Sequence, residues 1–276
     1  MSASAPTLGQ ALAHAASQGL QRLDAQLLLL HAVGRSQDER AWLLAHDQDP
    51  LAEDAALTFD ALCARRVQGE PLAYLVGQKE FHGLMLAVDA RVLVPRPDTE
   101  TLVEWGLVLL AGRTAPRVVD LGTGSGAIAL AIKHRRPDAK VVGVDRNEDA
   151  LAVARANGER LGLAITWQSG DWLKGLEGDL DLLVSNPPYI REDDPHLSAL
   201  IHEPLSALAA GHDGLQDLRS IVSSAWAHLA PGGWLLLEHG WDQAQDVRSL
   251  LSDAGFGQVG SRRDLAGIER CSGGCR

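Results

Sequence analysis

The chain has 276 residues, of which 46 % are hydrophobic, and 36 acidic against 25 basic side chains give a formal net charge of −11. This length suggests two domains, and this composition excludes a disordered chain. The three cysteines, Cys63, Cys271 and Cys275, are too few for a disulfide scaffold, and neither a membrane span nor a signal peptide is readable. We therefore expect a cytoplasmic protein, and its acidic charge weighs against direct nucleic-acid binding.

Residues 1–78 are predicted to form a small helical domain. Leucines such as Leu20, Leu23, Leu27 and Leu30 recur at helical intervals between polar residues, and β-branched residues are scarce. Four or five short helices fit this stretch. We interpret the leucine pattern as the core of a helical bundle.

Residues 79–96 are predicted to form a β-hairpin linker or a pair of short strands, because two short apolar runs flank Asp89-Ala90-Arg91 and prolines follow. Over 97–276, predicted helices alternate with predicted strands. The helices are expected near 98–111, from about 126, and near 148–161, 215–229 and 241–254, and the strands are the runs RVVDLG, KVVGVD, AITWQSGD, DLDLLVSN and GGWLLLEHG. This alternation predicts an α/β fold with a doubly wound, mostly parallel sheet. The final residues, CSGGCR, are expected to be a flexible tail, and no metal site is expected.

A glycine loop follows the strand in the sequence VVDLGTGSG. Gly122, Gly124 and Gly126 permit a tight turn and a close approach of ligand to backbone, and Asp145 ends the next strand, where it can accept both hydroxyls of a ribose. The loop alone also fits the dinucleotide pattern G-x-G-x-x-G/A. Asp120 favours S-adenosylmethionine instead, because a carboxylate suits the ammonium and sulfonium of that donor better than a pyrophosphate.

Two further segments follow strands at the edge where parallel sheets bind ligands. Asp171 is placed to accept from an adenine amino group and Trp172 to stack on the ring, although a tryptophan here can equally be part of the core. Glu238 and His239 end a later strand, and we assign them no catalytic role.

The sequence Asn186-Pro187-Pro188-Tyr189 is the most informative motif. The Asn186 side-chain oxygen and the Pro187 carbonyl are two acceptors that suit the two N–H bonds of a planar NH₂ group, and the prolines stiffen the turn. Tyr189 offers an apolar wall. Because amide and exocyclic amine nitrogens are poor nucleophiles, holding one in line with a methyl group indicates N-methyl transfer.

With these motifs the chain resembles the peptide-chain release factor glutamine N5-methyltransferases. DLGTGSGAIALA, VVGVD, DW and VSNPPY carry the resemblance, and GEPLAYLVGQKEFHGL, VLVPRPDTETLVE, EPLSAL, LLLEHGW and RDLAGIER extend it over nearly the whole chain. The resemblance implies a class I S-adenosylmethionine-dependent methyltransferase domain, Rossmann-like with a seven-stranded sheet, over residues 97–276. It also implies that the helical domain helps to dock the substrate.

The implied reaction transfers the methyl of S-adenosylmethionine, leaving S-adenosylhomocysteine, to the glutamine of the Gly-Gly-Gln motif in class I bacterial release factors. By the same resemblance, Asn186, Pro187 and Tyr189 are catalytic, and Asn186 to Tyr189, including Pro188, hold the substrate amide. The donor-binding residues implied are Gly122, Thr123, Gly124, Ser125, Gly126, Asp145, Asp171, Trp172 and Asn186.

The family pattern is altered at residues 198–202, SALIH, which are about two residues shorter than usual and lack an arginine, in the loop expected to form a flap over the substrate. Two alternatives remain: an N6-adenine-type DNA or RNA amino methyltransferase, and a non-catalytic partner that binds the donor. A nicotinamide oxidoreductase is the least supported alternative, since nothing after the glycine loop suggests hydride chemistry. We expect a monomer whose partners are release factors.

Overall fold

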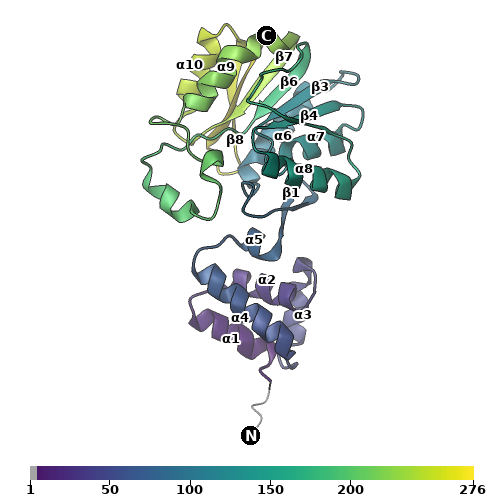
Figure 1. Cartoon of the computed structure of the whole chain (residues 1–276), viewed down its shortest axis with the longest axis vertical. Helices are drawn as coiled ribbons and strands as arrows, with labels where there is room; N and C mark the ends of the chain where they lie inside the picture. Colours follow the sequence, from purple (N-terminus) through teal and green to yellow (C-terminus); the bar gives the residue numbers. More distant parts are fainter. Residues whose placement is uncertain (1–4) are drawn as a thin grey trace. The chain divides into compact units, whose positions relative to one another are not determined.

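The computed structural model describes residues 5–276, which divide into two compact units, one ending at Gly77 and one over Gln78–Arg276 (Figure 1). Within the described residues, no helix is both long and apolar enough to span a membrane. The division at Gly77 places the β-hairpin in the second unit. The boundaries of the functional domains stay a prediction.

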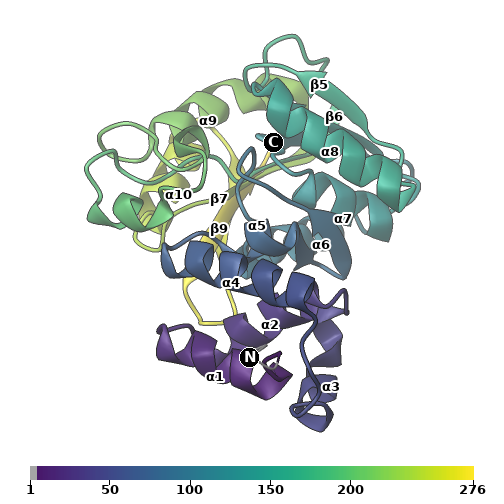
Figure 2. The same cartoon turned by 60° about the horizontal axis from the view of Figure 1, so that its bottom comes forward.

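The first unit is helical (Figure 2). Its helices are α1 (Leu8–Ser17), α2 (Arg22–Ala32), α3 (Arg40–Ala45), α4 (Glu53–Val67) and α5 (Leu72–Val76), with a 3₁₀ turn at Gln37–Glu39. Helix α2 contacts the other four, and its Leu28, Leu29 and Leu30 are fully buried. Leu23, which shares the leucine pattern, is 48 % exposed. The pattern therefore marks the core of this unit, with Leu23 at its edge.

The second unit contains a seven-stranded sheet in the order β5-β4-β3-β6-β7-β9-β8. The strands are β3 (Arg117–Leu121), β4 (Lys140–Asp145), β5 (Thr166–Ser169), β6 (Leu180–Ser185), β7 (Leu229–Glu238), β8 (Gly257–Arg263) and β9 (Glu269–Cys275). Strands β3 to β7 are parallel, while β9 is antiparallel to both of its neighbours. The predicted α/β class is confirmed, and the strand order reverses between β3 and β6, where open sheets bind ligands.

Helices cover both faces of this sheet (Figure 1). One face carries α6 (Glu100–Leu109), α7 (Ala127–Arg135) and α8 (Glu148–Leu161), and the other carries α9 (Gln216–His228) and α10 (Ala244–Asp253). Short 3₁₀ turns lie at η2 (Pro97–Thr99), η3 (Pro195–Leu200) and η4 (Leu205–Ala207). Because both faces are covered, β3, β4, β6 and the end of β7 are largely buried and apolar, which explains why the sequence pattern located them, whereas the edge strand β5 is polar and partly exposed.

The predicted hairpin exists, but its predicted position is wrong. Strands β1 (Gln78–Phe81) and β2 (Leu84–Ala87) pair around His82 and Gly83, and the second apolar run forms no strand. Both turn residues have positive φ, 51° and 79°, as a tight type I′ turn requires. The His82 N–H donates to the Glu100 carboxylate at 3.0 Å, which helps to hold this residue in its unusual conformation. Asp89 and Arg91 form a separate turn, in which Asp89 Oδ1 accepts from the Arg91 N–H at 3.0 Å.

The expectation of a flexible C-terminal tail is also wrong, because this segment is strand β9. Cys271 and Ser272 are fully buried. A Cβ on Gly273 would lie 2.4 Å from Leu236 Cδ2, and one on Gly274 would lie 2.7 Å from Phe256 Cβ. Glycine is therefore required by the large side chains on neighbouring elements, a cause that local sequence does not reveal.

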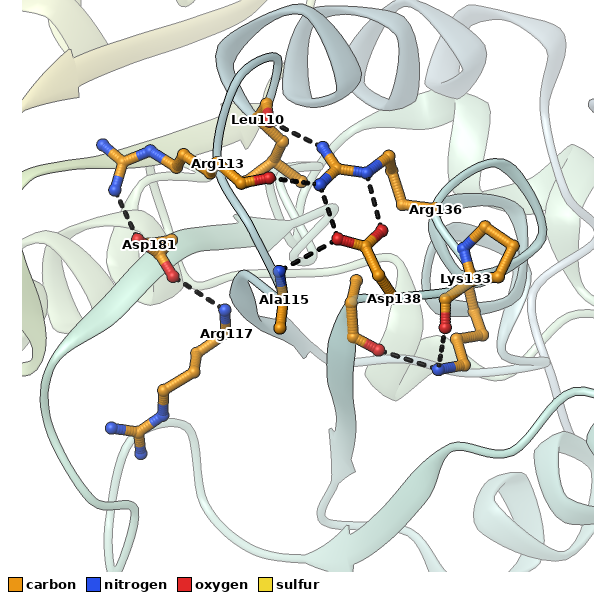
Figure 3. A network of polar contacts seen from close by, with 10 residues as sticks. Leu110, Arg113, Ala115, Arg117, Lys133, Arg136, Asp138 and Asp181 are labelled. Atoms are coloured by element: carbon orange, nitrogen blue, oxygen red, sulfur yellow. Dashed lines mark hydrogen bonds and ion pairs between the residues drawn. The ribbon is translucent and has the colours of Figure 1, made fainter.

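A network of arginines lies at the amino ends of the central strands (Figure 3). Arg113 pairs with Asp181 at the start of β6, and the second Asp181 oxygen accepts from the Arg117 N–H at 2.8 Å. Arg136, after α7, donates to the carbonyl oxygens of Leu110 at 2.6 Å and Arg113 at 2.7 Å. This network ties helix ends to β3 and β6 at the end of the sheet opposite to the carboxyl ends.

Candidate active site

A hollow opens at the carboxyl ends of β3, β4, β5 and β6, and it encloses about 730 Å³ of space between protein atoms, part of it open to solvent. Its lining combines apolar side chains with a few polar groups, which suits a small-molecule ligand or cofactor. Seven of the predicted site residues line it: Gly122, Gly124, Asp145, Asp171, Trp172, Asn186 and Pro188. Residues far apart in sequence therefore meet where the topology places a ligand.

The glycine loop is fixed against β4. The Gly122 and Thr123 N–H groups both donate to the Val144 carbonyl oxygen, at 2.8 and 2.9 Å. Gly126 begins helix α7 with φ +83°, and a Cβ there would lie 2.8 Å from the Trp167 ring. The loop therefore needs glycine at position 126 both for its backbone conformation and for space.

Asp145 lies at the rim of the hollow with both oxygens oriented. Its Oδ2 accepts from the Gly124 N–H and its Oδ1 from the Asn147 N–H, each at 2.9 Å. Asn147 in turn caps helix α8, where its side chain accepts from the Asp149 N–H at 2.9 Å. Each carboxylate oxygen retains a lone pair, so Asp145 can accept two further hydrogen bonds from a ligand.

Asp120 differs from the sequence-based expectation, because it does not line the hollow. It is fully buried, and its Oδ2 accepts from Thr123 Oγ1 at 2.6 Å and from the Ala129 N–H at 3.2 Å. Its Oδ1 has no hydrogen-bond partner in the range 5–276, and burial raises its pKa to about 7. Asp120 therefore braces the loop from beneath. Thr123 and Ser125 are likewise buried, and the Ser125 carbonyl accepts from Asn157 at 3.0 Å.

Asp171 and Trp172 line the hollow beyond β5. Asp171 pairs with Lys174, and Trp172 adopts φ +53°, which is uncommon for a bulky residue. The indole packs on the glycine loop, where a Cβ on Gly122 would lie 3.4 Å from the ring. The indole is therefore a fixed wall of the hollow.

The motif Asn186 to Tyr189 follows β6 directly. The Asn186 side-chain NH₂ donates to Thr99 Oγ1 at 3.3 Å, and the Tyr189 hydroxyl donates to Glu238 Oε1 at 3.4 Å. Pro187 and Tyr189 do not line the hollow. Among residues 5–276, no group donates a hydrogen bond to Asn186 Oδ1 or to the Pro187 carbonyl oxygen. Both oxygens are therefore available to a ligand.

The segment that follows residues 198–202 contributes a wall that the sequence did not assign. The Glu203 carboxylate is 2 % exposed, accepts from the Val94 N–H at 3.1 Å and pairs with Arg96. The residues after it that line the hollow are Pro204, Ser206 and Ala207. Arg146 reaches across to the Ser206 carbonyl at 3.4 Å. The segment after residues 198–202 is thus anchored beside the hollow.

Sequence reasoning missed most of the remaining lining: Arg91, Val92, Leu93, Val144, Arg146, Asn147, Ala150 and Gly170. Asn147 carried a usable signal, since a helix-capping residue two positions after a strand-ending acid lies at the same sheet edge. Arg91, Val92 and Leu93 lie in the segment that was predicted to be the hairpin, so no local pattern indicated that they line a ligand site.

Family models match both units. One described as the methyltransferase small domain matches residues 104–260, and one described as the PrmC N-terminal domain matches residues 8–77. Among solved structures, a methyltransferase from Pyrococcus furiosus aligns with TM-score 0.53 and 21 % identity, covering 77 % of this chain and 95 % of that one. A 16S rRNA methyltransferase from T. thermophilus aligns with TM-score 0.54 and 20 % identity, covering 72 % and 49 %. These two similarities support the fold.

Relatives named release factor glutamine methyltransferase are similar over nearly the full length. The one from Bordetella pertussis is 51 % identical, covering 94 % of this chain and 96 % of its own. The one from Xylella fastidiosa (strain Temecula1) is 47 % identical over 96 % of both chains, and the one from Escherichia coli (strain K12) is 42 % identical over 95 % of both. The resemblance found in the motifs is confirmed, and the chain belongs to the release factor glutamine methyltransferase family.

Proposed function

We propose that this protein transfers a methyl group from S-adenosylmethionine to the side-chain amide nitrogen of the glutamine in the Gly-Gly-Gln motif of class I release factors. The observation that carries the proposal is the position of Asn186: it lines the hollow, and its oxygen and the Pro187 carbonyl oxygen are both free to accept. Family membership supports the same reaction.

The residues present fit the donor. When bound, S-adenosylmethionine supplies an electrophilic methyl group on a sulfonium. Asp145 has lone pairs for the two ribose hydroxyls, and Asp171 and Trp172 offer a carboxylate and an aromatic face to the adenine. Gly122 and Gly124 let the ligand approach the loop backbone, while Thr123, Ser125 and Gly126 act by shaping that loop.

The substrate amide is held by acceptors. Asn186 Oδ1 and the Pro187 carbonyl each accept one N–H of the glutamine NH₂, which aims the nitrogen at the methyl group and stabilises positive charge that develops there. Pro188 stiffens the turn, and Tyr189 fixes it from behind through its hydrogen bond to Glu238. No strong base is needed before attack, because the proton leaves after the methyl group has transferred.

The same NH₂-holding motif would suit an adenine, but that alternative is not favoured, since the relatives carry the release-factor name and the net charge is −11. A non-catalytic donor-binding partner is disfavoured by the free acceptor oxygens. In our proposal the helical unit helps to dock the release factor. The protein works as a monomer in the cytoplasm without binding nucleic acid directly.

The test is transfer of a labelled methyl group. The protein is incubated with methyl-labelled S-adenosylmethionine and either a class I release factor or DNA, and peptides are analysed for the modified residue. We expect label on the Gly-Gly-Gln glutamine and none on DNA. Asn186→Ala is expected to abolish transfer while donor binding persists, and Ser223→Ala, on the exposed side of α9, serves as the control. Label on any other acceptor would overturn the proposal.

A further inference from the structure

Gln243 is a buried polar residue that has no role in the reaction described above. It lies at the N-cap position of helix α10 and is 8 % exposed. Its Oε1 accepts from the Gly240 N–H at 2.8 Å. Its Nε2 donates to the carbonyl oxygens of Tyr189 at 3.1 Å and Gly214 at 3.4 Å. Because carbonyl oxygens only accept and a backbone N–H only donates, these partners fix the direction of the Gln243 amide.

Tyr189 is the last residue of the motif that begins at Asn186, and its backbone is held on both sides. Its N–H donates to the Leu208 carbonyl oxygen at 3.2 Å, while its own carbonyl oxygen accepts from Gln243. Gly214 approaches the same carbonyl so closely that a Cβ on it would lie 2.3 Å from the Tyr189 oxygen. The absence of a side chain at position 214 therefore leaves this carbonyl room to reach the Gln243 amide.

The backbone at Tyr189 governs the direction of the Pro187 carbonyl, because Pro188 removes freedom between them. The Pro187 carbonyl oxygen lies in the peptide plane that joins Pro187 to Pro188, and the Pro188 ring fixes the φ angle that follows this plane. Only the ψ angle of Pro188 then rotates before the peptide plane that carries the Tyr189 N–H. Holding Tyr189 on both sides thus also limits the rotation of the Pro187 carbonyl.

We propose that Gln243 is a positioning residue for methyl transfer: its NH₂ group holds the Tyr189 carbonyl, and through it the Pro187 carbonyl, in the direction that accepts the substrate amide. The proposal rests on the methyl transfer proposed above. Gln243 does not line the hollow, so it acts through the motif and not on the donor. Without this hydrogen bond the motif can turn, and its two acceptors no longer match the two N–H bonds of the substrate.

Two variants separate the donor and acceptor functions of the Gln243 amide. Gln243→Met keeps a side chain of similar length and removes both functions. Gln243→Glu keeps the shape and the oxygen that accepts from Gly240, but an ionised carboxylate has no hydrogen to donate to Tyr189. Single-turnover transfer is measured at about pH 8.5, where a carboxyl group ordinarily is ionised, over a range of release-factor concentrations, and calorimetry gives the donor Kd.

We expect both variants to lower the maximal transfer rate about 10- to 100-fold, the range that a misplaced reacting group causes. The donor Kd and the half-saturating release-factor concentration should stay within about threefold of the unmodified protein, because neither binding event depends on the direction of the Pro187 carbonyl alone.

Asp181→Ala is the control for a general loss of stability. Asp181 lies in β6 at the end of the sheet opposite to the hollow, where it pairs with Arg113 and accepts from the Arg117 N–H at 2.8 Å. The variant loses both interactions. We therefore expect a lower midpoint of unfolding in urea and a normal maximal transfer rate.

A normal maximal rate in Gln243→Met overturns the inference, and so does a normal rate in Gln243→Glu, since the contact with Gly240 would then suffice. An equal slowing in Asp181→Ala also overturns it, because lost stability would explain the effect. If one Gln243 variant does not fold, the rate of the other decides. With label on the glutamine in the unmodified protein, these outcomes sink this inference alone, whereas absence of that label sinks the proposed function as well.

Discussion

Replacing Asp145 by asparagine tests donor binding separately from transfer. Each Asp145 oxygen already accepts one backbone N–H at 2.9 Å, from Gly124 and Asn147, and has one lone pair left for a ribose hydroxyl. In asparagine, an NH₂ group replaces one of the two carboxylate oxygens and faces a backbone N–H donor, so it no longer accepts from a ribose hydroxyl. The remaining oxygen still accepts from the other ribose hydroxyl, but this hydrogen bond no longer involves a charged group. Hydrogen bonds to a charged group contribute about 1.5 to 3 kcal/mol, against about 1 kcal/mol for neutral ones.

The two losses together come to about 2 to 5 kcal/mol, which raises the Kd for S-adenosylmethionine about 30-fold or more. Isothermal titration calorimetry with the donor and with S-adenosylhomocysteine measures it. Asp149→Asn is the matched control, because it removes the same charge from an exposed position in the first turn of α8. A Kd within threefold of normal for Asp145→Asn, or an equal weakening in the control, would refute the reasoning.

Two further predictions concern the loop. Gly126→Ala should lower the free energy of unfolding by about 2 to 4 kcal/mol in urea melts, because φ is +83° and a Cβ would clash with an indole at 2.8 Å. Gly162→Ala, with φ +65° and no neighbour within 4 Å, should cost only about 1 kcal/mol, and equal losses would show that the close contact does not matter. The pKa of Asp120 is raised from 3.8 to about 7, so its carboxyl favours the fold below pH 4 and loses that contribution as pH rises through 7. The stability of Asp120→Asn relative to the unmodified protein should therefore increase between pH 4 and pH 8, and a constant difference would contradict this.

The fold was predictable where burial is continuous. Strands β3, β4, β6 and the end of β7 are apolar runs because helices cover both faces, and their carboxyl ends bring Asp145, Asp171 and Asn186 together by topology alone. Strands β8 and β9 were not predictable, since GQVGSRR and ERCSGGC are polar or glycine-rich. Their conformation depends on partners such as Phe256 and Leu236.

The site was predictable to a similar extent. The motifs that follow strands were located from the sequence. The walls of the hollow near Val94 and Pro204 were not, because they depend on Glu203, which accepts a hydrogen bond from Val94 across 109 sequence positions. Thr99 was missed as a partner of Asn186 for the same reason, because 87 positions separate them. A contact between residues so far apart in the sequence produces no recognisable pattern in the sequence around either residue.

The interior position of β9 has a consequence for the order of folding. Among the strands of residues 5–276, β8 lies at the edge of the sheet and pairs only with β9, which in turn pairs with β7. Edge strand β8 thus cannot join the sheet before β9 does, and the local hairpin is expected to dock onto β7 as one cooperative unit. In native-state hydrogen exchange, the paired amides of β8 should accordingly open whenever those of β9 open.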